Sequence, residues 1–375
     1  MIGQKKSKNY YPFMDTFRGI SILWVIMHHV DHFFDMETIL GPALFPVFHL
    51  FARVGFLGVD MFFVISGFLI TGVLLDDLRD HVRVKRFYLR RFFKIGPQYF
   101  LAVVIGLAVS CWLTSSAPGG EKAGTAGLWG VLGYFVLLQN YMVQDQVLAH
   151  TWSLAIEEHF YLIYPLILAW VCRRAAGFED RRRALICFLV IVIGLINLVK
   201  FIGIDKGLVP YLFDSAHAFQ TTHYRIDALM FGCLLKYLEP WLSPPPGKRD
   251  TAGAVFFFAA GILLYAYLIW TGVMRFVWFT YMIAYLAPGA IFISALKGLS
   301  GQLDHPWLRW VGKSSYGTYL WHYIVAFPLL LLMPVRAFHH IGTVALYVIL
   351  CLAVGTLSTR TWEKYFLRLR DRVVP

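Results

Sequence analysis

Charged side chains are scarce in this chain. Only 15% of its 375 residues are Asp, Glu, Lys or Arg, whereas 58% are hydrophobic, and the mean hydropathy is +0.62. Soluble domains carry about 25% charged residues, so the composition excludes a soluble domain and indicates an integral membrane protein. A Ser/Gly-rich linker is also lacking between the long apolar stretches. We therefore expect residues 1–375 to form a single polytopic domain.

The chain also lacks the marks of secretion, metal binding and nucleic-acid binding. Its basic N-terminal segment has no cleavage site, and Arg18 and His29 interrupt the first apolar helix, which argues against a cleaved signal peptide. The five cysteines lie singly in apolar stretches, without Cys-x-x-Cys or Cys/His spacing, so we expect inert thiols and no metal site. The net charge of +12 resides in short loops and chain ends, where it reports membrane topology rather than nucleic-acid binding.

Long apolar stretches recur from end to end and predict an all-α polytopic membrane protein. Residues 128–140 are apolar but short for a crossing. If they do not cross, the basic segments 76–94 and 173–183 and both chain ends fall on one side, as the positive-inside rule requires. We therefore expect about ten transmembrane helices, with both termini cytoplasmic, and a short buried or re-entrant helix near 128–140. The expected spans are 17–34, 56–75, 95–113, 152–171, 185–203, 223–239, 251–270, 275–296, 315–333 and 342–362. The longest outer loops are then 35–54, 114–151 and 204–222.

Two ionisable residues stand out in the first span. Arg18 and His29 are eleven residues apart, so they share one helical face and lie about 16 Å apart along the axis. Ionisable groups at membrane depth are costly and usually mark function, which favours a site that is reached from one membrane face. An imidazole in an apolar site can accept a proton from a hydroxyl, so His29 is a candidate general base. A hydrogen-bonded packing histidine is the alternative, and His28, turned about 100° away, is expected to face packing.

A basic cluster lies where the chain re-enters the membrane. Arg90, Arg91 and Lys94 recur at helical spacing beside aromatic residues. One interpretation is ordinary positive-inside anchoring. The other is an anion site, because guanidinium groups grip phosphates bidentately and neighbouring aromatic rings can stack on a base. The second interpretation fits a nucleotide-bearing donor such as a coenzyme A thioester.

The segment 151–165 is the most polar start of any span. Ser153, Glu157 and Tyr161 recur at intervals of four residues and share one helical face. Adjacent carboxylates at the head of a membrane helix are poor packing residues, so a functional role is favoured. Glu157 is expected to orient an imidazole or to bind sugar hydroxyls.

Asp60 and the pair Ser66 and Gly67 each have two interpretations. Asp60 begins an otherwise uncharged helix, where a carboxylate suits the N-terminal dipole without any further role. A role in the site is equally compatible with its position. Ser66 and Gly67 form a small patch at mid-helix, which fits tight helix packing and close approach of a ligand equally well.

Three more polar residues lie in later spans. Arg225 and Asp227 are two residues apart and do not face each other, so each is expected to have a partner on another helix. Both residues are compatible with a structural ion pair and with a role in the site. His322 lies beside several tyrosines. Tyrosines are common in the aromatic belt at membrane interfaces, but a histidine is harder to assign to this belt.

Taken together, these segments resemble the acyltransferase 3 family of membrane O-acyltransferases. The matching motifs run in family order over nearly the whole chain, namely Arg18-x10-His29, GFLGVDMFFVISGFLIT, the arginine pair before IGP, TWSLAIEEHFYLIYP, RIDALMFG and SYGTYLWHY. The resemblance implies a ten-helix core and transfer of an acyl group, usually acetyl, from cytoplasmic acyl-coenzyme A to a hydroxyl. Acceptors in the family are mainly sugars and glycoconjugates, including surface polysaccharides, peptidoglycan, lipo-oligosaccharides and glycosylated small molecules.

The resemblance also implies roles for particular residues. The family's Arg-x10-His pair falls on Arg18 and His29, its Ser-x3-Glu motif on Ser153 and Glu157, and its arginine motif on Arg90 and Arg91. Two positions depart from the pattern. Lys94 stands where a second arginine is common, and the usual Glu-Lys-Pro ending of the last span reads Glu363-Lys364-Tyr365. Some relatives carry a fused extracytoplasmic domain, and we expect none in this chain.

We thus expect an integral membrane O-acetyltransferase of the cytoplasmic (inner) membrane of a bacterium. Acyl-coenzyme A is the donor substrate, no cofactor is permanently bound, the acceptor is a carbohydrate or glycoconjugate, and membrane lipid is a further partner. His29 deprotonates the acceptor hydroxyl or passes on the acyl group, and Arg18 stabilises donor or oxyanion charge. No Ser or Cys stands beside a base, which favours direct transfer.

Two rival interpretations remain. A proton-coupled transporter or flippase of a lipid-linked or anionic substrate would use the same intramembrane charges as a relay, although no internal repeat is visible. An inactive family member would serve as an acyl-sensing subunit, which the retained Arg18, His29 and Glu157 disfavour. The sequence carries no signal of oligomeric state.

Overall fold

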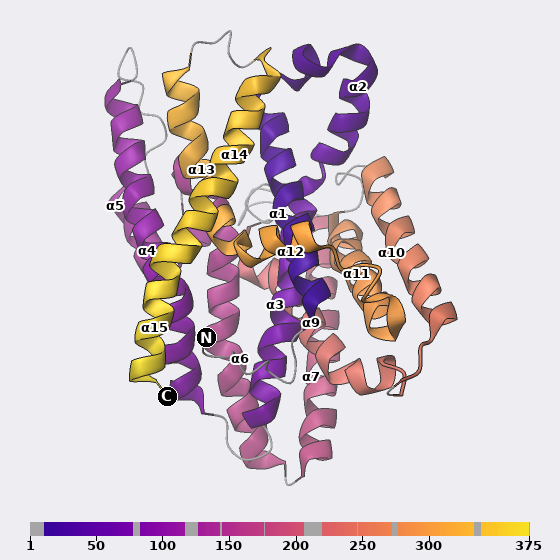
Figure 1. The fold of residues 1–375 in the computed structure, drawn as a ribbon. Helices are drawn as coiled ribbons and strands as arrows, with labels where there is room; N and C mark the ends of the chain where they lie inside the picture. The colour runs from indigo at the N-terminus through magenta and orange to yellow at the C-terminus, as the bar shows by residue number, and fades with distance from the viewer. Residues whose placement is uncertain are drawn as a thin grey trace, which may run out of the picture.

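The fold was analysed in a computed structural model that describes residues 11–77, 83–116, 127–142, 145–175, 177–205, 220–245, 247–271, 277–333 and 339–374. Within these ranges every regular element is a helix (Figure 1), so the predicted all-α class is confirmed. The long helices are α1 (Pro12–Phe33), α2 (Met36–Ala52), α3 (Gly58–Asp77), α4 (Val84–Ser116), α6 (Trp152–Arg174), α7 (Phe178–Lys200), α9 (Thr222–Leu242), α10 (Thr251–Thr271), α11 (Val277–Ser294), α13 (Ser315–Leu332) and α14 (Ile341–Ser358). Shorter helices are α5 (Leu128–Phe135), α12 (Pro306–Lys313) and α15 (Lys364–Val373).

Each of the ten expected spans coincides with one long helix. Of the described helical segments, seven are long and apolar enough to cross a membrane. The segments that contain α1, α9 and α13 fall outside this set, and these are helices into which the sequence places charged residues, histidines and tyrosines. The multi-pass character is therefore established, whereas the number of crossings remains a prediction.

The apolar stretch 128–140 is shorter and more exposed than expected. Its helix, α5, ends at Phe135 after eight residues, which is too short to cross a bilayer. Gly133 and Tyr134 are buried, whereas Trp129 is 76% exposed, so the short helix is buried on one face, and whether it is re-entrant stays a prediction. The chain turns at Leu137, whose φ of 62° lies in the left-handed region and ends the helix.

The outer segment 35–54 was expected to be a loop and is helical instead. α2 runs through it, with a kink at Gly41, where φ is 71°. The two prolines of α2 follow this kink, which is why the local sequence resembles a loop. The Asp35 side chain accepts a hydrogen bond from the Thr38 backbone N–H and caps the first turn.

Helices cross closely where glycine faces the backbone of a neighbour. A Cβ atom added to Gly67 of α3 would lie 1.9 Å from the Leu229 carbonyl oxygen of α9, and one added to Gly232 would lie 2.1 Å from the Val64 carbonyl oxygen. These distances are far below van der Waals contact, so α3 and α9 meet backbone to backbone. Gly67 is therefore a packing residue, while its neighbour Ser66 lines a cavity.

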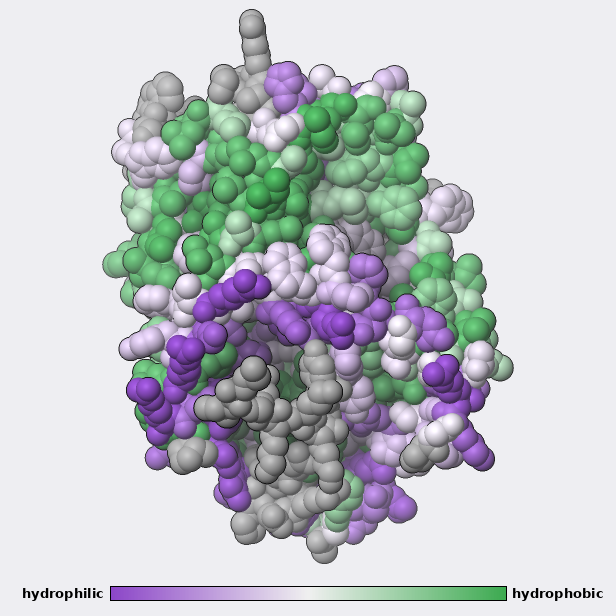
Figure 2. Space-filling view, in the orientation of Figure 1, coloured by the Kyte–Doolittle hydropathy of each residue, from purple (hydrophilic) through white to green (hydrophobic). Residues whose placement is uncertain are grey.

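Basic and apolar side chains gather in different parts of the helix bundle. The start of α4, the end of α6, the start of α7 and α15 lie in the lower half of the molecule (Figure 1), and all four regions are rich in basic residues. On the same face, apolar side chains cover the upper part, where α2, α13 and α14 lie, and a band of hydrophilic side chains crosses the middle (Figure 2). This distribution is typical of a bundle that is partly enclosed by lipid.

The last span continues beyond the point where the family pattern places a proline. α14 leads through a π-helical turn (Thr359–Glu363) directly into α15, and the helical run extends to Val373. Tyr365 supplies a backbone N–H that proline would lack, so the helix is free to propagate. α15 packs against α4.

Candidate active site

A single cavity collects most of the residues that the sequence marks for function. It has a volume of about 690 Å³, within the range of small-molecule sites, and helices α1, α3, α4, α6, α13 and α15 contribute to its wall. Six predicted residues line it, namely Arg18, Arg90, Arg91, Lys94, Ser153 and Glu157. They come from three helices that are distant in sequence, so the structure brings the predicted donor and catalytic motifs together.

The cavity is strongly basic. Seven of its lining residues are Lys or Arg and two are Asp or Glu. The cations include Lys236 of α9 and Arg370 of α15, which the sequence analysis did not single out. A concave surface of one charge sign concentrates ligands of the opposite sign, so the cavity suits a polyanion.

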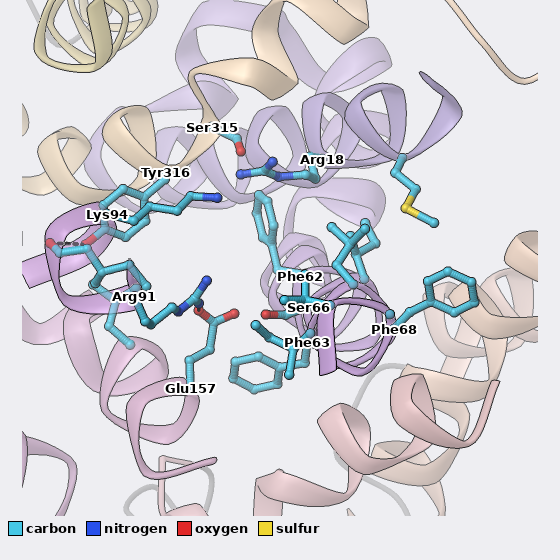
Figure 3. A pocket seen from close by; sticks show the side chains of 18 of the residues that line it. Arg18, Phe62, Phe63, Ser66, Phe68, Arg91, Lys94, Glu157, Ser315 and Tyr316 are labelled. Carbon is cyan, nitrogen blue, oxygen red and sulfur yellow. Dashed lines mark hydrogen bonds and ion pairs between the residues drawn. The ribbon is translucent and has the colours of Figure 1, made fainter. Parts of the chain in front are cut away.

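One wall of the cavity is organised around Arg91. Its Nη2 atom lies 3.9 Å from Oε2 of Glu157, and its guanidinium group lies 3.6 Å from the centre of the Tyr161 ring. The Tyr161 hydroxyl is hydrogen-bonded to Ser66, and Figure 3 shows Arg91, Glu157 and Ser66 directed toward the same space. Glu157 therefore has an arginine as its charged partner, whereas the sequence analysis expected it to orient an imidazole or to bind sugar hydroxyls.

Arg18 and Lys94 form the opposite wall. Their side chains point toward each other, with Ser315 beside Arg18 (Figure 3). Nη1 of Arg18 lies 3.6 Å from Oδ1 of Asp15, one turn earlier on α1. The carboxylate of Glu363 is near enough to interact with both Lys94 and Arg18. Asp15 and Glu363 thus partly offset the charges of the two cations on this wall.

Ser153 and Tyr319 close the inner end of the cavity. The Tyr319 hydroxyl donates to the backbone carbonyl of His150 at 2.8 Å, and the Ser153 hydroxyl lies 2.7 Å from the Tyr319 oxygen. Ser153 therefore donates to Tyr319, because the single phenolic hydrogen is already used. This pair connects the cavity to a group of histidines.

Three histidines gather beyond Tyr319. The ring of His322 lies 5.0 Å from that of His29 and 4.8 Å from that of His150, measured between centroids. The Tyr323 hydroxyl lies 3.3 Å from Nδ1 of His29, so His29 has a tyrosine as its hydrogen-bond partner. We call His29, His150, His322 and Tyr323 the histidine cluster. α1 is continuous, so it carries Arg18 to the cavity and His29 to this cluster.

Two of these histidines have assignable tautomers. Nδ1 of His322 faces the carbonyl oxygen of Tyr319, and Nε2 of His150 lies 3.1 Å from the carbonyl oxygen of Leu320. A carbonyl only accepts, so each of these nitrogens carries the hydrogen. The other ring nitrogen of each is left as a lone pair, is buried, and has no partner among the described residues. Each histidine can therefore accept a hydrogen bond from a hydroxyl.

His150 was missed by the sequence analysis. It ends the loop before α6, in a 3-10 turn (Gln146–Thr151), where hydropathy indicates a surface loop. Its position three residues before Ser153 was the available signal. Within the described ranges, no group of three or more His, Cys, Asp or Glu side chains is arranged to hold a metal ion.

The remaining predicted residues form buried ion pairs away from the cavity. Nη2 of Arg225 donates to both carboxylate oxygens of Asp60 at 2.8 Å, and Nζ of Lys200 donates to Asp227 at 2.6 Å. As expected, Arg225 and Asp227 each have a partner on another helix, namely α3 and α7. Asp60 thus bridges helices in addition to beginning one. Lys200 was not anticipated, because it lies at the end of an otherwise apolar span.

Breaking one of these pairs should destabilise the protein. We expect Asp60→Asn to lower the unfolding free energy by about 3–5 kcal/mol, because it leaves the buried Arg225 guanidinium without its carboxylate. The midpoint of thermal unfolding in detergent measures the effect. Glu179→Gln, which removes a 61% exposed partner of Arg182, is the matched control and should change stability by less than about 1 kcal/mol. Equal stability of the two variants would contradict a structural role for the Asp60 pair.

Comparisons with known proteins agree with the motifs. The acyltransferase domain model matches residues 11–360. The peptidoglycan O-acetyltransferase OatA of Listeria monocytogenes is 28% identical over 337 residues, which are 84% of this chain and 49% of that protein. The O-acetyltransferase OatA of Staphylococcus aureus strain NCTC 8325 is 27% identical over 365 residues, which are 91% of this chain and 54% of that protein.

A putative O-acetyltransferase of Staphylococcus aureus strain COL is 27% identical over 343 residues, or 85% of this chain and 51% of that protein. The chain thus spans about half the length of the curated relatives it matches. No solved structure matches it. Because the domain model covers nearly all of the chain, and the motif residues Arg18, Arg91, Ser153 and Glu157 line one cavity, this chain belongs to the acyltransferase 3 family.

Proposed function

We propose that this protein transfers an acetyl group from acetyl-coenzyme A, bound in the basic cavity, to a hydroxyl of a carbohydrate. The observation that carries this proposal is the meeting of Arg18, Arg91, Ser153 and Glu157 in one cavity, whose Ser153 and Tyr319 are hydrogen-bonded to each other and, through Tyr319, to the backbone of His150. Ionisable side chains such as these are costly to place at membrane depth unless they have a function. Family membership supports acyl transfer over transport.

The positions of the cations determine the orientation of the donor in the cavity. Coenzyme A has its phosphates at one end and its thioester at the other. The cations of α4 and the hydrogen-bonded pair Ser153 and Tyr319 come from different helices of the cavity wall, and only the Ser153–Tyr319 pair contacts the backbone of His150. Phosphates near Arg91 and Lys94 would leave the thioester near Tyr319 and the histidine cluster. The apolar side chains of α3, including Phe62 and Leu69, suit the uncharged pantetheine arm.

His29 serves as the general base in this proposal. Donation of its Nδ1–H to the Tyr323 oxygen leaves Nε2 free to take the proton of the acceptor hydroxyl. The hydroxyl oxygen then attacks the thioester carbonyl, while Arg18, which points toward Lys94 in the cavity (Figure 3), offsets the negative charge of the donor phosphates. As the carbon–sulfur bond breaks, the imidazolium of His29 returns the proton to the leaving sulfur. The products are the ester and free coenzyme A.

A carbohydrate is the acceptor that the comparisons favour. One relative is a peptidoglycan O-acetyltransferase. The unpaired nitrogens of His150 and His322 accept hydrogen bonds, and vicinal hydroxyls of a sugar are matching donors. In this proposal the carbohydrate hydroxyl binds at the histidine cluster beside Tyr319, next to the thioester of the donor.

We place the protein in the cytoplasmic membrane of a bacterium, with ten crossings and both termini in the cytoplasm. The clustering of basic chain segments in the lower half of the bundle supports this orientation (Figure 1). The cavity would then open to the cytoplasm, where acetyl-coenzyme A is made.

The test is release of free thiol from acetyl-coenzyme A by purified protein in detergent, with peptidoglycan fragments and other polysaccharides as acceptors. Detergent abolishes any membrane gradient, so a transporter would release no thiol. We expect acceptor-dependent thiol release, with matching acetyl ester on the carbohydrate. A folded protein that releases no thiol with any acceptor, yet moves a substrate across a vesicle membrane, would contradict the proposal.

A further inference from the structure

The outer end of the cavity includes a residue from beyond the family-matched region. The acyltransferase domain model ends at residue 360, and α15 follows it. Arg370 of α15 lines the cavity together with Arg86 and Arg90 of α4. We call these three residues the outer arginine cluster. The sequence analysis assigned the basic tail to topology alone, so this arrangement calls for another explanation.

The three guanidinium groups lie close together. Arg86 and Arg90 are four residues apart and share one face of α4. Both Arg86 and Arg370 are near enough to Arg90 to repel its charge. Like charges at this distance destabilise one another, so the cluster gains from any anion that binds between them.

One carboxylate already lies in this position. Oδ1 of Asp371 is 2.9 Å and 2.8 Å from Nε and Nη2 of Arg370, and 3.9 Å from Nη2 of Arg90. Nη1 of Arg90 also donates to the Val374 carbonyl at 3.1 Å, which fixes the end of the chain against α4. The Asp371 side chain is 59% exposed, so it can swing away. The carboxylate oxygen held between Nε and Nη2 of Arg370 is placed where an oxygen of a phosphate would bind.

We propose that the outer arginine cluster binds the 3′-phosphate of coenzyme A, and that Asp371 occupies this subsite until the phosphate displaces it. The inference rests on the proposed function, because a thioester at the inner end places the nucleotide end at the outer arginines. Arg86 lies about 12 Å along α4 from Lys94, which separates this subsite from the inner cations. A phosphate monoester carries close to two negative charges, more than either phosphate of the diphosphate bridge, and so matches a cluster of three arginines best.

The test compares coenzyme A with 3′-dephospho-coenzyme A. Calorimetric titrations use the full chain in lipid-free detergent. We expect the wild type to bind coenzyme A about tenfold or more tightly than the dephospho compound, the effect of a hydrogen bond between charged groups. Arg370→Ala should remove most of this preference by weakening coenzyme A binding alone. Arg372→Ala removes an exposed arginine of the same helix that does not line the cavity, and should keep the preference.

A second variant tests the part assigned to Asp371. Asp371→Asn removes the competing charge, so it should tighten coenzyme A binding and leave dephospho-coenzyme A unchanged. Three results would overturn the inference, namely equal wild-type affinities for the two compounds, equal preferences in Arg370→Ala and Arg372→Ala, or unchanged coenzyme A binding in Asp371→Asn. An arginine cluster that serves anionic lipid headgroups would give the first of these. Wild type that binds neither compound would overturn the proposed function and this inference with it.

Discussion

Replacing His29 with alanine should lower kcat about 10²–10⁴-fold while leaving donor affinity unchanged. A general base contributes this factor in enzymes that deprotonate a hydroxyl. Donor affinity should persist because His29 belongs to the histidine cluster, and the described lining of the cavity does not include it. Acceptor-dependent thiol release measures kcat, and calorimetry with acetyl-coenzyme A measures affinity.

The adjacent histidine provides the control for this experiment. Nδ1 of His28 lies 2.9 Å from the Ala52 carbonyl oxygen, so this side chain joins α1 to α2, and its ring centre is 5.1 Å from that of His29. His28→Ala removes the same imidazole one position earlier and should retain kcat, with some loss of stability. If His29→Ala folds and turns over like the wild type, His29 is not the base, and the mechanism proposed for this site fails.

Replacing Arg91 with alanine should weaken acetyl-coenzyme A binding about 10- to 100-fold. A hydrogen bond to a charged group contributes about 1.5–3 kcal/mol, which corresponds to this range. Arg91 also stacks on Tyr161 and pairs with Glu157, so its loss leaves a carboxylate facing the donor phosphates. Arg91→Lys keeps the charge but loses the planar fork, and should have an intermediate affinity.

Arg174→Ala is the matched control for Arg91→Ala. Arg174 is a basic residue at the end of α6, its guanidinium lies 5.0 Å from the Trp170 ring centre, and it does not line the cavity. Arg174→Ala changes the net charge by the same amount as Arg91→Ala and should leave donor affinity as in the wild type. Donor affinities that do not distinguish Arg91→Ala from Arg174→Ala would remove the inner phosphate contact from the account.

The parts of the site that could be predicted from sequence are those where a polar residue interrupts an apolar helix. Arg18, Glu157 and His29 are conspicuous because such residues are costly in lipid, and the cost requires an explanation wherever they occur. The positions of the ten expected spans were predictable from long apolar stretches, although the segments with α1, α9 and α13 are not among the seven that are long and apolar enough to cross a membrane. The structure then adds that Arg18 and Glu157 share a cavity.

The parts that could not be predicted depend on packing between helices. Periodicity assigns Asp227 to a helix face but does not identify Lys200 as its partner, which lies on another helix. His150 and Arg370 lie in segments where polar residues are ordinary, so their composition carries no signal. The pairing of Glu157 with Arg91 in place of an imidazole likewise follows from how α4 and α6 meet.

The most direct test of the account is calorimetric titration of acetyl-coenzyme A into purified, folded wild-type protein in detergent. The account predicts saturable binding of one donor molecule per chain without any membrane gradient, because the cations that line the cavity are present in the resting protein. A folded protein that gives no heat of binding over the accessible donor concentrations would contradict it, and the cavity would then require a different ligand.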